Sequence, residues 1–132
     1  MSKHMGSFSL YAIGQPPKLE IWCSDTFRNE VRALFAGASA ADRASLANIN
    51  AVVTRLAGGG RLSSDTFRRE QDGYAFRAGR LRFYGAFSDA RTGAFVLSHP
   101  IIKRHQKLDP VDADRTARCV AQFDTYVRRS RP

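Results

Sequence analysis

The hydrophobic period changes at Gly58-Gly59-Gly60, and this change constrains the fold more than any other feature of the chain. Before these glycines, apolar residues recur at three- and four-residue steps, as on the buried face of a helix; after them, apolar and polar residues alternate, as in a half-buried strand. A chain of 132 residues fits one domain. The sequence therefore predicts a single α+β domain in which helices pack against an antiparallel sheet.

Two helices are predicted before the glycines, and they are expected to form a hairpin joined near Gly37. The first begins at Ser24 or Asp25, because either side chain can cap a helix. The second begins near Ser39 and ends at Gly58. The residues expected to face the core are Phe27, Val31, Leu34 and Phe35 in the first helix, and Leu46, Ile49, Val53 and Leu56 in the second.

Alternating segments predict the strands. One over residues 18–23 precedes the first helix, and residues 7–13 could form another short strand. Three more, over 74–78, 81–87 and 94–99, are separated by turn sequences and predict an antiparallel meander. The expected order is therefore strand, two helices, three strands and one helix.

The final helix is predicted to begin at Asp109 and Pro110. Asp109 can cap a helix, and Pro110 suits the first helical position because its fixed φ is already helical. The side chains expected to be buried are Ala113, Ala117, Val120, Phe123 and Val127.

Positive charge is the strongest functional signal. The chain has 21 Lys and Arg against 12 Asp and Glu, a net charge of +9. Residues 61–107 contain ten basic and four acidic residues, so this segment holds six of the nine net charges. A compact protein this basic attracts polyanions, and nucleic acid is its natural partner. A solvated surface that merely keeps the protein soluble is the alternative explanation.

Membrane and secretory classes are not indicated. No run approaches the roughly 18 apolar residues of a membrane-spanning helix, and the first residues contain no apolar stretch like that of a signal peptide. The internal His4-Met5 looks like a cloning junction with the natural start at Met5. Residues 1–5 are therefore set apart from a single domain over 6–132.

Cysteine and histidine usage favours a cytoplasmic protein without a metal. Cys23 and Cys119 are far apart, and reduced, buried structural thiols are expected rather than a disulfide. The three histidines, including His4, have no ligand-like spacing with Cys or Asp. No metal site and no other cofactor is predicted.

Two stretches in the second half of the chain carry a family resemblance. One is Tyr74-Ala-Phe-Arg-Ala-Gly-Arg-Leu-Arg-Phe-Tyr84, and the other is Phe95-Val-Leu-Ser-His-Pro-Ile-Ile-Lys-Arg-His-Gln-Lys-Leu-Asp-Pro110. The first resembles the paired strands of RelE/HigB-type toxins, on which a basic residue precedes an Arg-aromatic/aliphatic-Tyr strand. The second resembles the phage-derived, HigB-like branch, where an apolar strand runs into a basic segment and then a helix. The resemblance covers about residues 18–127.

The resemblance implies a RelE-like fold and the toxin of a type II toxin-antitoxin system. Toxins of this ParE/RelE superfamily usually cleave mRNA, often on the ribosome, and are silenced by a cognate antitoxin that covers the basic site. The expected partners are therefore mRNA, with or without the ribosome, and an antitoxin. No membrane partner is expected.

The resemblance also assigns roles to basic residues. Arg82 stands at the strand-opening Arg of the family and Arg104 in its basic pair after the last strand. We expect both to be catalytic, because an Arg fork can bond two oxygens of a phosphorane and keeps its charge. Further RNA or phosphate contacts are expected from Arg77, Arg80, Lys103, Lys107, Tyr84 and His99.

The general base is harder to assign. Metal-independent RNA cleavage needs a base to take the proton of the 2′-hydroxyl, and the late tyrosine of RelE has no counterpart here, where Pro110 or its neighbours stand. His105 is our candidate, because the basic run around it should keep the imidazole neutral. His99 precedes Pro100 at the end of an apolar strand, where a structural histidine is the favoured interpretation. Among the aromatics near the basic residues, Tyr84 is expected to be exposed for base stacking.

Two alternatives from other classes stay open. A ParE-like protein would share the fold but poison DNA gyrase, and its basic cluster would not be catalytic. A nucleic-acid-binding module without activity would show salt-sensitive binding and no cleavage.

Overall fold

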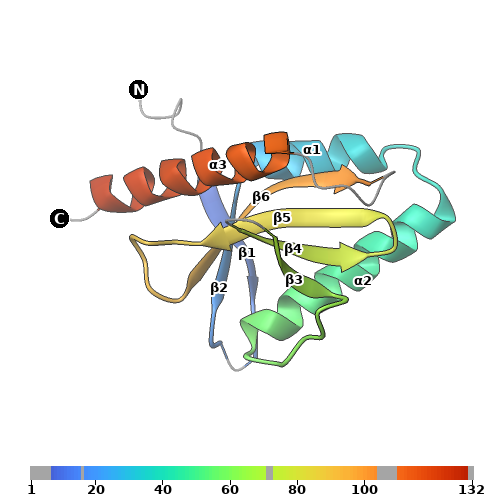
Figure 1. The fold of residues 1–132 in the computed structure, drawn as a ribbon, viewed down its shortest axis with the longest axis horizontal. Helices are drawn as coiled ribbons and strands as arrows, with labels where there is room; N and C mark the ends of the chain where they lie inside the picture. The colour runs from blue at the N-terminus through green and yellow to red at the C-terminus, as the bar shows by residue number, and fades with distance from the viewer. Residues whose placement is uncertain (1–6, 16, 71–72, 104–109, 131–132) are drawn as a thin grey trace.

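The fold is α+β, with three helices and one six-stranded sheet (Figure 1). Its computed structural model describes residues 7–15, 17–70, 73–103 and 110–130. The elements are β1 (Phe8–Ile13), β2 (Glu20–Ser24), α1 (Asp25–Phe35), α2 (Ala40–Ala57), β3 (Phe67–Glu70), β4 (Gly73–Ala78), β5 (Leu81–Phe87), β6 (Ala94–Ile102) and α3 (Pro110–Arg129).

The sheet is mixed, which corrects the expectation of a purely antiparallel one. Its strand order is β1-β2-β6-β5-β4-β3, and the β2–β6 pair is parallel while the other four pairs are antiparallel. Parallel neighbours need a long crossover connection. Here the connection is long enough, because it contains α1, α2 and the strands β3 to β5.

The two consecutive helices begin at the predicted caps. Ser24 Oγ accepts a hydrogen bond from the Phe27 amide at 3.1 Å, and Ser39 Oγ accepts one from the Asp42 amide at 3.2 Å. Gly37 lies between the helices with a φ of +71°, a conformation that costs other residues more than glycine. The helix boundaries inferred from the sequence are confirmed.

Several local predictions differ from the structure. Strand β3 is not among the strands predicted from the sequence, and its two central arginines are both exposed on the sheet edge. In α3, Ala117 is exposed and Thr116 is buried in its place, whereas Val120 and Phe123 are buried as expected. Leu34 in α1 is 37% exposed rather than packed in the core. The predicted cap Asp109 lies outside the described residues.

The sheet is covered on both faces. One core cluster joins α1 and α2 to the sheet through residues such as Phe27, Val53 and Phe83. The other joins α3 to the opposite face through Val96, Val120 and Phe123. In Figure 1, α2 lies behind β4 while α3 runs along the other side of the sheet. Within the part of the chain that is described, no helix is long and apolar enough to cross a membrane.

Candidate nucleic-acid interface

Two arginines lie side by side on the β4–β5 hairpin. Arg77 and Arg82 are direct partners in the antiparallel register. Leu81 and Phe83 on either side of Arg82 point into the core beneath α1 and α2. Because successive side chains of a strand point to opposite faces, Arg82 and its partner Arg77 point to the α3 side of the sheet.

Backbone carbonyl oxygens hold the guanidinium of Arg82. The residue is 7% exposed, and Nη1 donates to the carbonyl oxygens of Gly79 at 2.8 Å and Leu81 at 3.0 Å. Burial lowers the pKa of Arg82 below its usual value, and the neighbouring charge of Arg77 lowers it further. Arginine nevertheless keeps its charge near neutral pH.

Neither Arg77 nor Arg82 takes part in an ion pair with a carboxylate among the described residues. Arg77 Nε is buried and has no hydrogen-bond acceptor within that part of the chain. Like charges directly opposite each other on a sheet are destabilising. The pair therefore has N–H donors that could form hydrogen bonds to a bound anion.

Strand β3 adds two residues that the sequence analysis missed. Arg68 is opposite Ala75 in the register, and Ala75 is in turn opposite Tyr84, so Arg68 shares the α3 side of the sheet with the arginine pair. Glu70 follows two positions later on the same side and is half-buried. Both charges act on Arg82, Arg68 lowering and Glu70 raising its pKa. Their signal, a short alternation interrupted by charges, was too weak to predict a strand.

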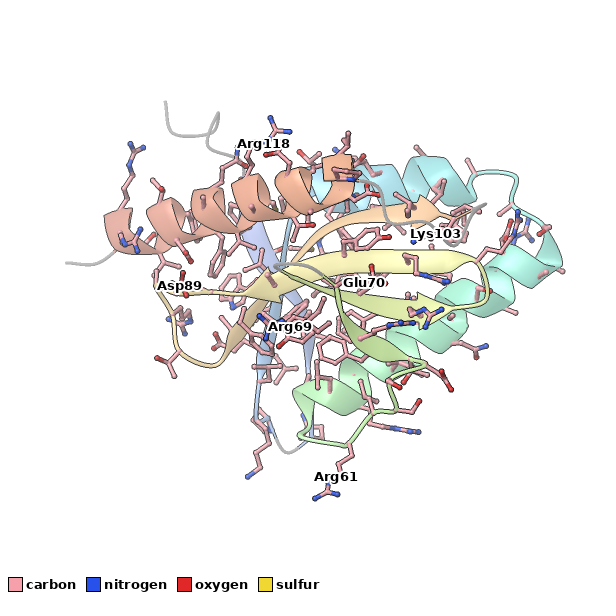
Figure 2. All side chains as sticks on the ribbon, in the orientation of Figure 1. Arg61, Arg69, Glu70, Asp89, Lys103 and Arg118 are labelled. Atoms are coloured by element: carbon pink, nitrogen blue, oxygen red, sulfur yellow. The ribbon has the colours of Figure 1, made fainter. Side chains whose placement is uncertain are left out.

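We call these four residues, Arg68, Glu70, Arg77 and Arg82, the arginine face. Figure 2 places Glu70 over β5 and Lys103 at the end of β6. The Lys103 amide donates to the Arg80 carbonyl at 2.8 Å, so both residues lie at the same end of the hairpin. Arg80 itself is exposed and pairs with Asp42 at 3.4 Å.

Tyr84 is buried, which corrects the expectation that it is the exposed stacking aromatic. Only 4% of the residue is exposed, and its ring lies 5.3 Å from the His99 ring. It faces α3, because β5 alternates and its neighbour Phe83 belongs to the opposite core. The exposed aromatic of this hairpin is Phe87, at 42%.

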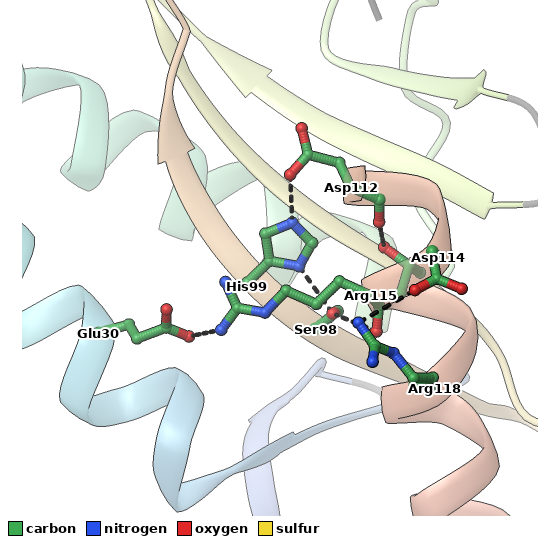
Figure 3. A network of polar contacts seen from close by, with 8 residues as sticks. Glu30, Ser98, His99, Asp112, Asp114, Arg115 and Arg118 are labelled. Atoms are coloured by element: carbon green, nitrogen blue, oxygen red, sulfur yellow. Dashed lines mark hydrogen bonds and ion pairs between the residues drawn. The ribbon is translucent and has the colours of Figure 1, made fainter. Parts of the chain in front are cut away.

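His99 is wholly buried in a polar network at the start of α3 (Figure 3). Its Nε2 lies 2.8 Å from Asp112 Oδ1, and its Nδ1 lies 2.8 Å from Ser98 Oγ. Burial lowers the pKa of His99, and the Asp112 hydrogen bond only partly opposes this. A neutral imidazole that donates from Nε2 to Asp112 and accepts at Nδ1 from Ser98 satisfies both contacts.

A β-bulge makes this network possible. Tyr84 is paired with His99 and the next residue, Gly85, with Leu97, so Ser98 is an extra residue in β6. The bulge lets two consecutive side chains, Ser98 and His99, both point toward α3, where Ser98 Oγ also lies 3.4 Å from the Arg115 carbonyl oxygen. Beside it, Arg115 pairs with Glu30 of α1.

The three residue types of this network also form hydrolase triads, but the geometry here does not suit catalysis. Ser98 is 4% exposed and His99 is fully buried, so no substrate can reach the hydroxyl in this structure. His99 and Asp112 instead fasten β6 to α3. This supports the structural interpretation of His99 and leaves it without a route to RNA.

The remaining predicted site residues, Arg104, His105 and Lys107, lie outside the described residues, and their roles stay predictions. Within the described ranges, no group of His, Cys, Asp and Glu residues could hold a metal ion.

Both cysteines are free thiols. Burial raises the pKa of the Cys23 thiol to about 11, and it also raises the pKa of Cys119. The two thiols therefore stay protonated near neutral pH and are poor nucleophiles.

No family model and no curated protein matches this chain.

Proposed function

We propose that the protein is an RNA endonuclease, the toxin of a type II toxin-antitoxin pair with a RelE-like fold, and that it binds its substrate on the arginine face. Apart from the additional strands β1 and β3, the order β2, α1, α2, β4, β5, β6 and α3 is the order that the resemblance to RelE/HigB toxins implies. The expected setting is the cytoplasm, where mRNA and a cognate antitoxin would compete for this face.

The observation that carries the proposal is the paired Arg77 and Arg82. Two like charges lie side by side here, one of them on a largely buried residue, and neither is paired with a carboxylate among the described residues. Such a pair opposes folding, and a role in binding an anion would explain why it is present. A phosphate group between them would offset the repulsion and accept from their unused N–H groups. Arg68 adds a third cation on the same side of the sheet.

The same cations suit the transition state of metal-independent RNA cleavage. When the 2′-oxygen attacks the adjacent phosphorus, negative charge grows on the non-bridging oxygens of the phosphorane. Donors that are already oriented stabilise this charge without reorganising. The backbone carbonyls of Gly79 and Leu81 orient the Arg82 guanidinium in this way before any substrate binds.

Binding without cleavage is the second candidate function. The burial of His99 favours it, because the one histidine among the described residues is not accessible as an acid or base. In that case the arginine face would hold RNA or DNA by charge alone, with strong salt dependence and no product.

The test compares the wild-type protein with an Arg77→Ala, Arg82→Ala double variant on a labelled single-stranded RNA. We expect new 5′-hydroxyl and 2′,3′-cyclic phosphate ends from the wild type only. We also expect the salt dependence of binding to weaken in the double variant, by a slope of about 0.7 for each lost phosphate contact. Melting temperatures should confirm that the double variant is folded.

A matched control removes the same charge elsewhere. Arg61 and Arg118 are exposed and lie on opposite sides of the molecule, away from the arginine face (Figure 2). An Arg61→Ala, Arg118→Ala variant should cleave like the wild type. Equal loss in both double variants would show that only net charge matters, and salt-sensitive binding by the wild type with intact RNA would establish the second candidate. If the wild type inhibited gyrase supercoiling instead, the ParE-like alternative would replace both.

A further inference from the structure

An unsatisfied carboxylate oxygen lies at the edge of the arginine face. Glu70 Oε2 is buried, and no described atom donates a hydrogen bond to it. Buried polar atoms in native proteins nearly always have a partner, so an exception calls for an explanation. The unsatisfied Nε of Arg77 is a second exception on the same side of the sheet.

The surroundings of Glu70 place it between the arginines and α3. It lines a small cavity with Gly73 of β4, Tyr84 of β5, and Ala113 and Thr116 of α3. In Figure 2 the Glu70 side chain lies over β5. Its charge acts on Arg82, where it partly opposes the lowering of the pKa by burial, yet no ion pair among the described residues joins the two.

The two exceptions are complementary in chemistry. Arg77 Nε is a donor without an acceptor, and Glu70 Oε2 is an acceptor without a donor. A ribonucleotide offers both at once, because its phosphate oxygens accept hydrogen bonds and its 2′-hydroxyl donates one. DNA lacks that hydroxyl and would leave the carboxylate unsatisfied.

We propose that Glu70 is the general base for RNA cleavage on the arginine face, an inference that rests on the proposed function. The Glu70 carboxylate takes the proton of the 2′-hydroxyl while the 2′-oxygen forms a bond to phosphorus and the bond from phosphorus to the 5′-oxygen breaks. The 5′-oxygen takes a proton from water, and the resulting hydroxide takes the proton from Glu70. The products are a 2′,3′-cyclic phosphate and a 5′-hydroxyl end, and the carboxylate is regenerated.

This assignment differs from the expectation for His105. It uses a residue whose placement is described and whose side chain shares a face with Arg68, Arg77 and Arg82. No ion pair among the described residues neutralises the carboxylate, and the residue is only half-buried, whereas Ser98 is 4% exposed. A base must keep an open acceptor for its substrate.

The test uses Glu70→Gln, which keeps the shape of the side chain and removes its basicity. We expect cleavage of a single-stranded RNA to slow by about 100-fold or more, the typical range for loss of a general base. RNA affinity should stay unchanged or increase, because a negative charge is removed beside phosphate. Asp89→Asn, an exposed carboxylate away from the face, is the control.

The outcomes separate the two proposals. If Glu70→Gln cleaves like the wild type while the Arg77→Ala, Arg82→Ala variant does not, the proposed function stands and Glu70 is not the base. If Glu70→Gln loses RNA binding and melting temperature together with cleavage, its role is structural and this inference is overturned. If the wild-type protein cleaves no RNA, both proposals are wrong.

Discussion

Nε2 of His99 and Oδ1 of Asp112 lie 2.8 Å apart and join the last strand of the sheet to the first turn of the last helix. His99 also packs against the ring of Tyr84, which in turn lines the cavity beside Glu70. The contact therefore determines how α3 sits next to the arginine face. It gives the histidine a structural role that can be measured separately from any activity.

Removing the carboxylate of Asp112 should destabilise the protein. Asp112→Ala leaves the buried Nε2 proton of His99 without an acceptor, which costs about 1–3 kcal/mol of the free energy of unfolding. Urea denaturation at neutral pH measures this loss. Asp114→Ala is the control, because Asp114 is exposed and its pair with Arg118 is worth less than about 0.5 kcal/mol. Equal losses in the two variants would contradict a special role for the His99 contact.

Stability should decrease as the pH falls below the ordinary pKa of histidine. Burial lowers the pKa of His99 from 6.5, so the unfolded chain binds this proton at a higher pH than the folded protein does. The free energy of unfolding therefore falls as the pH drops from 6.5 through the lower, folded value, and above 6.5 it is unaffected by His99.

Urea denaturation across this range, with His99→Gln as the comparison, tests the effect of pH. The variant should show a flatter profile. Glu20 does not interfere, because Arg91 lowers its pKa from 4.5 and its stabilisation is lost only at more acidic pH. Parallel profiles for the wild type and the variant would contradict the buried, neutral state of His99.

Gly14 should tolerate no side chain. A Cβ at Gly14 would lie 2.0 Å from the Gly58 backbone nitrogen at the end of α2, and backbone cannot move aside as a flexible side chain can. We expect Gly14→Ala to cost at least about 2 kcal/mol in the free energy of unfolding, as overpacking of a close contact does. A Cβ at Gly58 would meet only ordinary contacts, the nearest at 3.6 Å, so Gly58→Ala should be nearly neutral. Similar melting temperatures for the two variants would show that the chain relaxes around Gly14.

The sequence predicts the helices and the central strands well because their signals are local. The structure confirms the caps at Ser24 and Ser39 and the buried apolar positions Ile49 and Val53. These could be predicted because the signals of a helix come from residues close together in the chain. The β4–β5 hairpin follows from alternation and a turn at Gly79, which has a φ of +56°. Its pairing places Arg77 opposite Arg82.

The rest depends on contacts between distant segments. The parallel pairing of β2 with β6 has no signature in either strand, because each pairs with residues far away in the chain. The bulge at Ser98 aims His99 at Asp112, and a one-residue irregularity cannot be recognised from alternation. Glu70 was overlooked for the same reason, since its place beside the arginines exists only once β3 has paired with β4.

If the arginine face is kept for binding rather than for stability, a neutral substitution there should strengthen the fold. Arg77→Met removes a buried donor that has no acceptor among the described residues and removes the repulsion with Arg82, while the methionine keeps most of the apolar stem. We expect the free energy of unfolding to rise by about 0.5–2 kcal/mol, as in other substitutions at functional sites, and RNA affinity to fall. Arg69→Met on the neighbouring strand is the control, because Arg69 is exposed and should change stability by less than about 0.5 kcal/mol. Chemical denaturation and RNA titration of the same preparations decide the matter: a destabilised Arg77→Met variant with normal affinity would make Arg77 a structural residue.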